Sequence, residues 1–142
     1  IWTFPEAASD AEPSAVFLRV LVGLSDVISL HCYCEPTELQ QRLEDLGALG
    51  RPILLTEFMA RPMNSTLANS LPVLAEHNAW AYTWGLFRGR SQTHLPWKTW
   101  AGEAAGEAEP WFHDIFHENG TAYSGEDIKE IWWHTIGRRL RL

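Results

Sequence analysis

The chain has 142 residues, of which 46% are apolar, and it carries a formal net charge of −7 at pH 7. This length and apolar content suit a single domain with a sizeable core. The negative charge argues against nucleic acid or an anionic membrane surface as a partner. The sequence contains no run of about 18 or more apolar residues, so we expect no transmembrane helix. Because the chain starts with Ile1 rather than Met, we expect a further N-terminal portion to precede it.

Three short apolar runs predict β-strands. They span residues 27–31, 52–57 and 79–84. Continuous apolar runs of this kind suit parallel strands that are covered on both faces. The first run ends at His31 with Tyr33 just beyond it, the second ends at Glu57, and the third ends at Trp84. All three therefore carry reactive or aromatic side chains at the C-terminal end, where the active sites of α/β barrels lie.

Helical patterns separate these runs. Residues 37–49 carry one leucine stripe and residues 65–77 carry another. The stripes consist of Leu39, Leu43, Leu46 and Leu49, and of Leu67, Leu71 and Leu74. Gly50 is a C-terminal stop for the first helix, whereas Pro72 predicts a separate or kinked first turn in the second. This alternation predicts βαβ units, with parallel strands side by side in chain order and helices on one face.

The rest of the chain differs in character. Residues 87–123 show no helical or strand period, and we interpret them as a functional loop. The loop carries Trp97, Trp100 and Trp111 beside the polar residues Gln92, Thr93 and His94. A final helix is predicted over residues 124–137, with Ser124 as its N-cap. Its expected buried stripe consists of Ile128, Ile131, Trp132 and Ile136.

The two cysteines lie two positions apart. This is a poor spacing for a disulfide, so we interpret Cys32 and Cys34 as free thiols packed near a strand end. They give no signal of a redox compartment. The compartment stays open, with a secreted or periplasmic location among the alternatives.

A metal site is one alternative function. His113 and His117 are spaced i, i+4, which can bind zinc on a helix, and His31 lies close to the cysteines. These histidines are not part of a helical His-Glu-x-x-His motif, in which a glutamate accompanies the two zinc ligands. We therefore predict no metal and no cofactor.

The eight tryptophans suggest a sugar ligand. A large flat apolar ring with one donor suits the C–H face of a pyranose. At strand ends and in loops we expect such platforms, and Trp84, Trp97, Trp100 and Trp111 occupy these positions. In contrast, Trp80, Trp132 and Trp133 are expected to serve in packing.

The three strand ends resemble those of clan A retaining glycoside hydrolases. The run closing on His31 and leading to Tyr33 resembles their sixth strand. The run ending in Leu-Thr-Glu at Glu57 resembles the seventh, whose terminal Glu is the nucleophile. Tyr-Thr-Trp-Gly around Trp84 resembles the eighth, whose Trp floors the subsite beside the scissile bond. The longer segments 56–62, 92–97 and 109–115 resemble a bacterial branch related to family 5, often cellulases or xylanases, and the likeness covers nearly the whole chain.

The chain departs from this family in one respect. Clan A enzymes place their acid/base Glu after an Asn, and the sequence holds no Asn-Glu pair, only Glu118-Asn119 in reverse order. A full barrel needs roughly 250 residues, and Ile1-Trp2 resembles the tail of a fifth strand. We therefore interpret the chain as the C-terminal part of a TIM (β/α)8 barrel, about strands 6 to 8, with the N-terminal half missing. It is expected to be inactive alone, because retention needs two carboxyl groups about 5–5.5 Å apart.

The resemblance implies a role for each site residue. Glu57 would attack the anomeric carbon and form a glycosyl-enzyme. Tyr33 would donate its hydroxyl to Glu57, His31 would hold Tyr33 or a sugar hydroxyl, and Trp84 would stack under the sugar. Further substrate contacts are expected from Arg61, Gln92, Trp97 and Trp111. The implied substrate is a β-linked poly- or oligosaccharide, and the alternative is a non-catalytic carbohydrate-binding protein.

Overall fold

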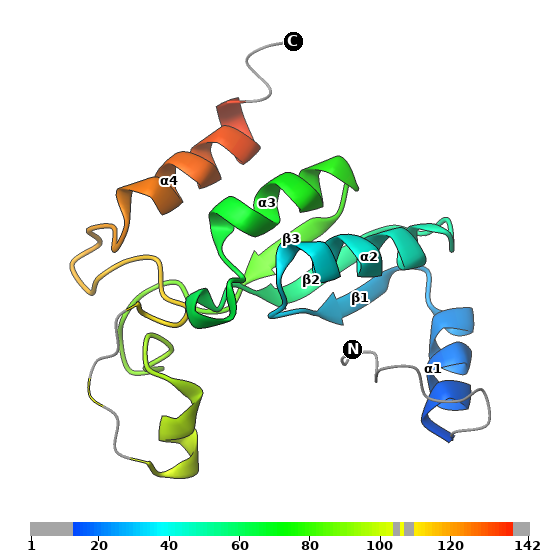
Figure 1. Cartoon of the computed structure of the whole chain (residues 1–142), viewed down its shortest axis with the longest axis horizontal. Coiled ribbons are helices and arrows are strands. Elements are labelled where there is room, and N and C mark those ends of the chain that lie inside the picture. The colour runs from blue at the N-terminus through cyan, green and yellow to red at the C-terminus, as the bar shows by residue number, and fades with distance from the viewer. Residues whose placement is uncertain (1–12, 104–105, 107–109, 138–142) are drawn as a thin grey trace.

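The computed structural model describes residues 13–103, 106 and 110–137. Helices and strands alternate along this part of the chain (Figure 1). In order they are α1 (Pro13–Leu24), β1 (Ile28–His31), α2 (Pro36–Gly47), β2 (Ile53–Phe58), α3 (Leu67–Glu76), β3 (Trp80–Thr83) and α4 (Gly125–Trp132). Two short 3₁₀ turns, η1 (Arg61–Met63) and η2 (Trp97–Ala101), lie between them, and α4 continues into a π-helical turn, η3 (Trp133–Gly137).

The strands form one parallel sheet in the order β1-β2-β3. This confirms the predicted α/β class and the predicted strand order. The register places Ser29 opposite Leu54 and Leu54 opposite Trp80, so these three side chains share one face of the sheet. Because β2 is the central strand, Glu57 lies near the C-terminal end of the middle of the sheet.

Helices α2 and α3 lie together on one face of the sheet (Figure 1). Alternate strand residues point toward these helices, as the period of two requires. The buried core consists mainly of Ile28, Leu30, Ile53 and Leu55 from the strands, Leu39, Leu43 and Leu46 from α2, and Leu67 and Leu74 from α3. The expected leucine stripe of the first helix is thus buried apart from Leu49, which lies beyond its end and is 42% exposed.

The opposite face of the sheet is open among the described residues. Trp80 and Tyr82 alternate on β3 and are 77% and 63% exposed. The expectation that the strands are covered on both faces is therefore wrong for the described part of the chain. The strand order β1-β2-β3 explains this, because two right-handed crossovers that run in the same direction along a sheet place both helices on the same face.

Two helices differ in detail from their predictions. Pro72 lies inside α3 without splitting off a first turn, and its ring is exposed to solvent. In α4 the Ser124 cap is confirmed, since its Oγ accepts from the Asp127 N–H at 3.4 Å. Trp132 and Ile136, however, are 49% and 52% exposed rather than buried. The π-helical turn begins at Trp133, and its wider winding breaks the 3.6-residue period that had placed Ile136 on the stripe.

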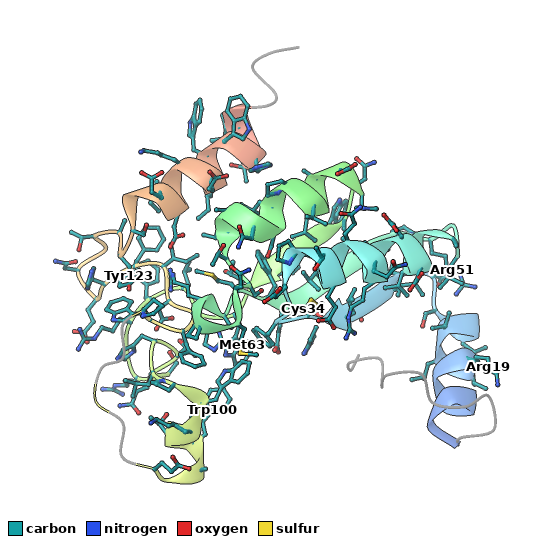
Figure 2. All side chains as sticks on the ribbon, in the orientation of Figure 1. Arg19, Cys34, Arg51, Met63, Trp100 and Tyr123 are labelled. Carbon is teal, nitrogen blue, oxygen red and sulfur yellow. A yellow bond between two sulfur atoms is a disulfide. The ribbon has the colours of Figure 1, made fainter. Side chains whose placement is uncertain are left out.

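Helix α1 was not predicted from the sequence. The guanidinium of Arg51, labelled in Figure 2, donates to the carbonyls of Val22 and Ser25 and so ties the end of this helix to the start of β2. None of the described helices is both long enough and apolar enough to span a membrane.

Candidate functional site

Glu57 lies at the centre of the candidate site. The Tyr33 hydroxyl donates to its Oε2 at 2.7 Å, and His31 Nδ1 lies 3.2 Å from the same oxygen. The irregular register at the end of β1 brings this about, since it places His31 directly opposite Glu57. The predicted hydrogen bond from Tyr33 to Glu57 is therefore confirmed, whereas the contact of His31 with Glu57 was not predicted. The carboxylate is only 23% exposed, so these contacts make up much of its surroundings.

Aromatic rings hold Tyr33 from the side. Its ring centroid is 5.2 Å from that of Trp97 and 5.5 Å from that of His113, both in edge-on geometry. Burial, and then the hydrogen bond and the negative charge of Glu57, raise the pKa of Tyr33 well above its ordinary value. The phenol therefore stays protonated and acts as the donor in its bond to Glu57.

Cys32 and Cys34 form a disulfide on either side of Tyr33. The prediction of two free thiols is wrong. On an extended strand, the Cα atoms of residues two positions apart are separated by about 6.6 Å. The Cα atoms of Cys32 and Cys34 are closer, at 5.2 Å, which is well within the range for a disulfide. The chain has already left β1 at His31 and turns here, and this turn brings the two sulfurs together.

A cavity of about 670 Å³ opens beside Tyr33, and we refer to it as the Tyr33 cavity. Its walls come from the segment after β1, from the first turns of α2, from η1 and from one loop residue. They consist of His31, Cys32, Tyr33, Cys34, Glu35, Glu38, Arg42, Pro62, Met63, Asn64 and Trp97. Cys34 and Met63, both labelled in Figure 2, lie at this same end of the sheet. The cavity therefore lies beyond the C-terminal end of β1, beside Tyr33 and His31, and Glu57 is not among the residues that line it.

Trp84 follows β3 at the same end of the sheet. Its backbone N–H donates to the Phe58 carbonyl at 3.0 Å, which places it beside the end of β2. Its side chain is 36% exposed, and it is not among the residues that line the Tyr33 cavity. The aromatic wall of the cavity is Trp97 instead, one of the predicted substrate contacts.

A relay of hydrogen bonds supports Trp97. Its indole N–H donates to His113 Nε2 at 2.8 Å, so this nitrogen is the acceptor, and Nδ1 donates to the Met59 carbonyl at 2.5 Å. Burial is the main cause that lowers the pKa of His113, which keeps the ring neutral. Met59 itself is buried and has a φ of 80°, a conformation rare for a residue with a side chain and one typical of turns at functional sites.

This relay also bears on the zinc alternative. Both ring nitrogens of His113 are engaged in hydrogen bonds, and His117 packs edge-on against Trp111 at 4.6 Å. Within the described ranges, no group of three or more His, Cys, Asp or Glu side chains could hold a metal ion.

Arg61 braces the long loop instead of facing Glu57. It donates to the carbonyls of Trp111 and Asp114 at 3.0 and 3.1 Å and to Asp127 Oδ2 at 2.6 Å. Its guanidinium also lies 4.6 Å from the centre of the Tyr123 ring. Only 8% of the Arg61 side chain is exposed, so these contacts occupy it, and its expected contact with substrate stays a prediction.

The other predicted outer residues fall in two groups. Trp111 is 2% exposed and stacked on Tyr123 at 4.5 Å, so its ring offers no free face to a sugar. Gln92 and Trp100 are exposed, the first in a turn with φ 54° and the second on η2. A cavity contact is thus shown for Trp97 and not for Gln92 or Trp111.

A buried cluster beside Gly85 was predicted only in part, since Thr93 and His94 were noted in the loop but Asp114 and their contacts with it were not. Thr93 Oγ1 donates to Asp114 Oδ1 at 2.6 Å, and His94 Nδ1 lies 3.6 Å from Asp114 Oδ2. Gly85 packs directly against this pair with a φ of 82°. Thr93, His94 and Asp114 sit in a loop without periodicity, where only a concentration of polar residues near glycine could have pointed to them.

Comparisons with known protein families, with curated proteins and with solved structures found no match to this chain. The class of protein defined by the fold is an α/β protein with a three-stranded parallel sheet, and a Tyr–Glu–His cluster lies at the strand ends.

Proposed function

We propose that the chain is the C-terminal part, about strands six to eight, of a (β/α)8 barrel in a retaining glycoside hydrolase of the clan A type. The parallel order of β1, β2 and β3 supports this, as does the position of both crossover helices on one face. In such a barrel the helices lie outside and the opposite face of each strand points inward. The open face with Trp80 and Tyr82 would then be the inner face, covered by the N-terminal half of the barrel.

One observation carries the proposal, namely the 2.7 Å hydrogen bond from the Tyr33 hydroxyl to Glu57 Oε2. It orients a half-buried carboxylate at the C-terminal end of the central strand, where barrel enzymes hold their catalytic groups. The other carboxylate oxygen accepts no hydrogen bond from Tyr33 and is the atom available for attack.

In the proposed mechanism Glu57 acts as the nucleophile. It attacks the anomeric carbon and forms a covalent glycosyl-enzyme while a second carboxyl group protonates the leaving oxygen, and that group then activates water to release the sugar. The second carboxyl group would come from the preceding part of the barrel. Tyr33 and His31 position Glu57 throughout, and the reaction requires no metal or cofactor.

The proposed substrate is a β-linked poly- or oligosaccharide of the cellulose, xylan or mannan kind. The Tyr33 cavity supports a sugar ligand, because its one large aromatic wall, Trp97, lies beside polar groups such as Glu35 and Asn64. Sugar sites combine a flat apolar surface with hydrogen-bonding groups in this way.

The proposal predicts the effect of substitutions in the complete barrel, expressed with its upstream coding sequence. Glu57→Gln should lower hydrolysis of an aryl β-glycoside by a factor on the order of 10⁴ to 10⁶, since the isosteric amide cannot act as nucleophile. Tyr33→Phe should lower it less, on the order of 10²-fold, the scale of losing one positioned donor. Binding of the sugar should survive in both variants.

The control is Glu118→Gln, which alters an exposed loop carboxylate and should leave turnover unchanged. A 2-deoxy-2-fluoro glycoside with a good leaving group should label the peptide that contains Glu57, as seen by mass spectrometry. Undiminished turnover in Glu57→Gln, or a label on another carboxylate, would move the nucleophile elsewhere.

The second candidate is a non-catalytic carbohydrate-binding protein. The exposed side chains of Trp80 and Tyr82 favour it, because two aromatic rings on one face of a strand form a platform for a sugar chain. An oligosaccharide binding isotherm separates the two functions. Binding that is lost in a Trp80→Ala, Tyr82→Ala variant but unaffected by Glu57→Gln, in a complete protein without turnover, would favour the binding protein.

A further inference from the structure

We propose that the Cys32–Cys34 disulfide is a redox-sensitive positioning device, which holds Tyr33 against Glu57 when oxidised and releases it when reduced. The effect of this disulfide on catalysis rests on the proposed function, whereas its effect on the position of Tyr33 does not. The inference deepens the role of the site, because it adds regulation to the Tyr33–Glu57 pair.

The covalent geometry places the disulfide directly around Tyr33. The two cysteines are its immediate neighbours in the chain, and their Cα atoms are held 5.2 Å apart. The Tyr33 hydroxyl must reach Glu57, which lies 24 positions further along the chain. Fixing the backbone on both sides of Tyr33 removes conformational freedom that the hydrogen bond would otherwise have to overcome.

The Tyr33 side chain makes a hydrogen bond to Glu57 and packs against the edge-on rings of Trp97 and His113. No main-chain hydrogen bond of Tyr33 or Cys34 appears among the turn and loop bonds of the described residues, whereas the Cys32 N–H donates to the Glu57 carbonyl at 3.0 Å. The segment is thus anchored by the sheet at Cys32 and by the disulfide at Cys34.

The effect of the disulfide should be local. In the loop-closure account, a cross-link stabilises a fold in proportion to the logarithm of the loop it closes, and a loop with one residue between the cysteines is the smallest case. Cys32 belongs to the buried core and its N–H is held by the Glu57 carbonyl, so reduction should free Tyr33 while Cys32 stays in place and the sheet stays folded.

A reductant can reach the bond. Both cysteines line the Tyr33 cavity, and Cys34 is the more exposed of the two, since Cys32 is only 5% exposed. The thiolate of a small dithiol would attack Cys34 Sγ, break the disulfide and release Cys32 as a thiolate, which takes up a proton. The second thiol of the reagent then displaces Cys34, so the dithiol becomes a cyclic disulfide and both cysteines become thiols.

The test follows the three tyrosines, Tyr33, Tyr82 and Tyr123, by ¹³C NMR of chain labelled at the tyrosine Cζ, with Tyr33→Phe assigning the key resonance. Excess dithiothreitol should shift the Tyr33 resonance, because the ring leaves its contacts with Glu57, Trp97 and His113. The signals of Tyr82 and Tyr123 should not move, because they lie on the open face of the sheet and under Arg61. The double variant Cys32→Ser, Cys34→Ser should reproduce the reduced spectrum without reductant.

Three outcomes would overturn the inference. The first is a Tyr33 resonance that stays unchanged although mass spectrometry shows both thiols reduced. The second is a shift of all three tyrosines together, which would make the disulfide a support of the whole fold. The third is a disulfide that excess dithiothreitol leaves intact in the folded chain. Because the test needs no turnover, its failure would leave the hydrolase proposal standing, and a failed turnover test would leave this inference standing.

Discussion

At the scale of single residues, His113 shows how a buried ring can organise a site without touching a ligand. It accepts from Trp97 and donates to Met59, and its ring also packs against Tyr33. Only a neutral imidazole with its proton on Nδ1 can make both bonds. The positions of the cavity wall and of the Glu57 donor therefore both depend on the protonation state of one fully buried histidine.

This dependence predicts a pH effect on stability. Burial lowers the pKa of His113 in the folded chain and Arg61 adds to this, although Met59, Asp114 and Glu57 act against it. As the pH falls below about 6.5, the unfolded chain takes up a proton that the folded chain resists. The contribution of His113 to stability is therefore complete above this pH and is lost as the pH falls toward the folded pKa, by at most about 1.4 kcal/mol per pH unit.

The measurement is denaturant unfolding at a series of pH values between about 7.5 and 5. His113→Asn keeps a donor for the Met59 carbonyl but cannot titrate, so the variant should show a shallower loss of stability toward acid. The same substitution at His77, at the C-terminal end of α3, controls for the replacement of a histidine in general. An equally steep loss in His113→Asn would assign the acid sensitivity to another group.

At the scale of elements, the turn after β3 joins the sheet to the long loop. Gly85 has a φ of 82°, and a Cβ on it would lie 2.6 Å from Asp114 Oδ1 and 2.9 Å from His113 Cβ. The chain can therefore leave β3 in this direction only if residue 85 has no side chain. The absence of a side chain lets Asp114 and His113 pack against the strand end.

Gly85 and Gly102 have the same φ, so comparing their substitutions distinguishes the cost of backbone strain from the cost of close packing. Gly102, after η2, also has a φ of 82°, but a Cβ there would meet nothing within 4 Å. Gly102→Ala should cost about 1–2 kcal/mol of unfolding free energy, the cost of the left-handed conformation alone. Gly85→Ala should cost about 1–3 kcal/mol more, because it also overpacks a dense site. Equal losses in the two variants, measured by chemical denaturation, would contradict the close packing at Gly85.

At the scale of the whole molecule, the described chain has one covered and one open sheet face. The covered face holds the core with α2 and α3, while Trp80 and Tyr82 lie on the open face. The sheet also ends in two edge strands, β1 and β3. Exposed apolar patches and unpaired strand edges are both templates for association.

The isolated chain should therefore self-associate. Sedimentation velocity should show oligomers or aggregates at micromolar concentration, and a Trp80→Lys, Tyr82→Lys variant should shift the distribution toward monomer. Trp100→Lys, which alters an aromatic residue of 60% exposure on η2, is the control and should have a smaller effect. A monodisperse parent chain that melts cooperatively would show that the open face does not drive association.

Part of the candidate site could be predicted from local sequence patterns, and part depends on contacts between residues far apart in the chain. The sequence predicted Glu57, His31 and Tyr33 as a cluster, because residues at the ends of neighbouring parallel strands must meet at one edge of the sheet. It did not predict that Arg61 is buried in a brace, since its partners Trp111, Asp114 and Asp127 lie 50 or more positions further along the chain. Trp97 was predicted only as one of several further substrate contacts, yet it lines the cavity beside Tyr33.

The sequence by itself determined the alternation of strands and helices, the parallel sheet and the strand ends at which the site lies. These features follow from hydrophobic periods and chain breakers, which act over a few residues and can be read locally. Only the tertiary structure decided the pairing of Cys32 with Cys34, the neutral form of His113 and the open face around Trp80. The disulfide depends on the turn that the chain takes after β1. The neutral form of His113 and the open face depend on which distant segments meet in space, because burial, hydrogen bonding and pKa are properties of the surroundings and not of the residue alone.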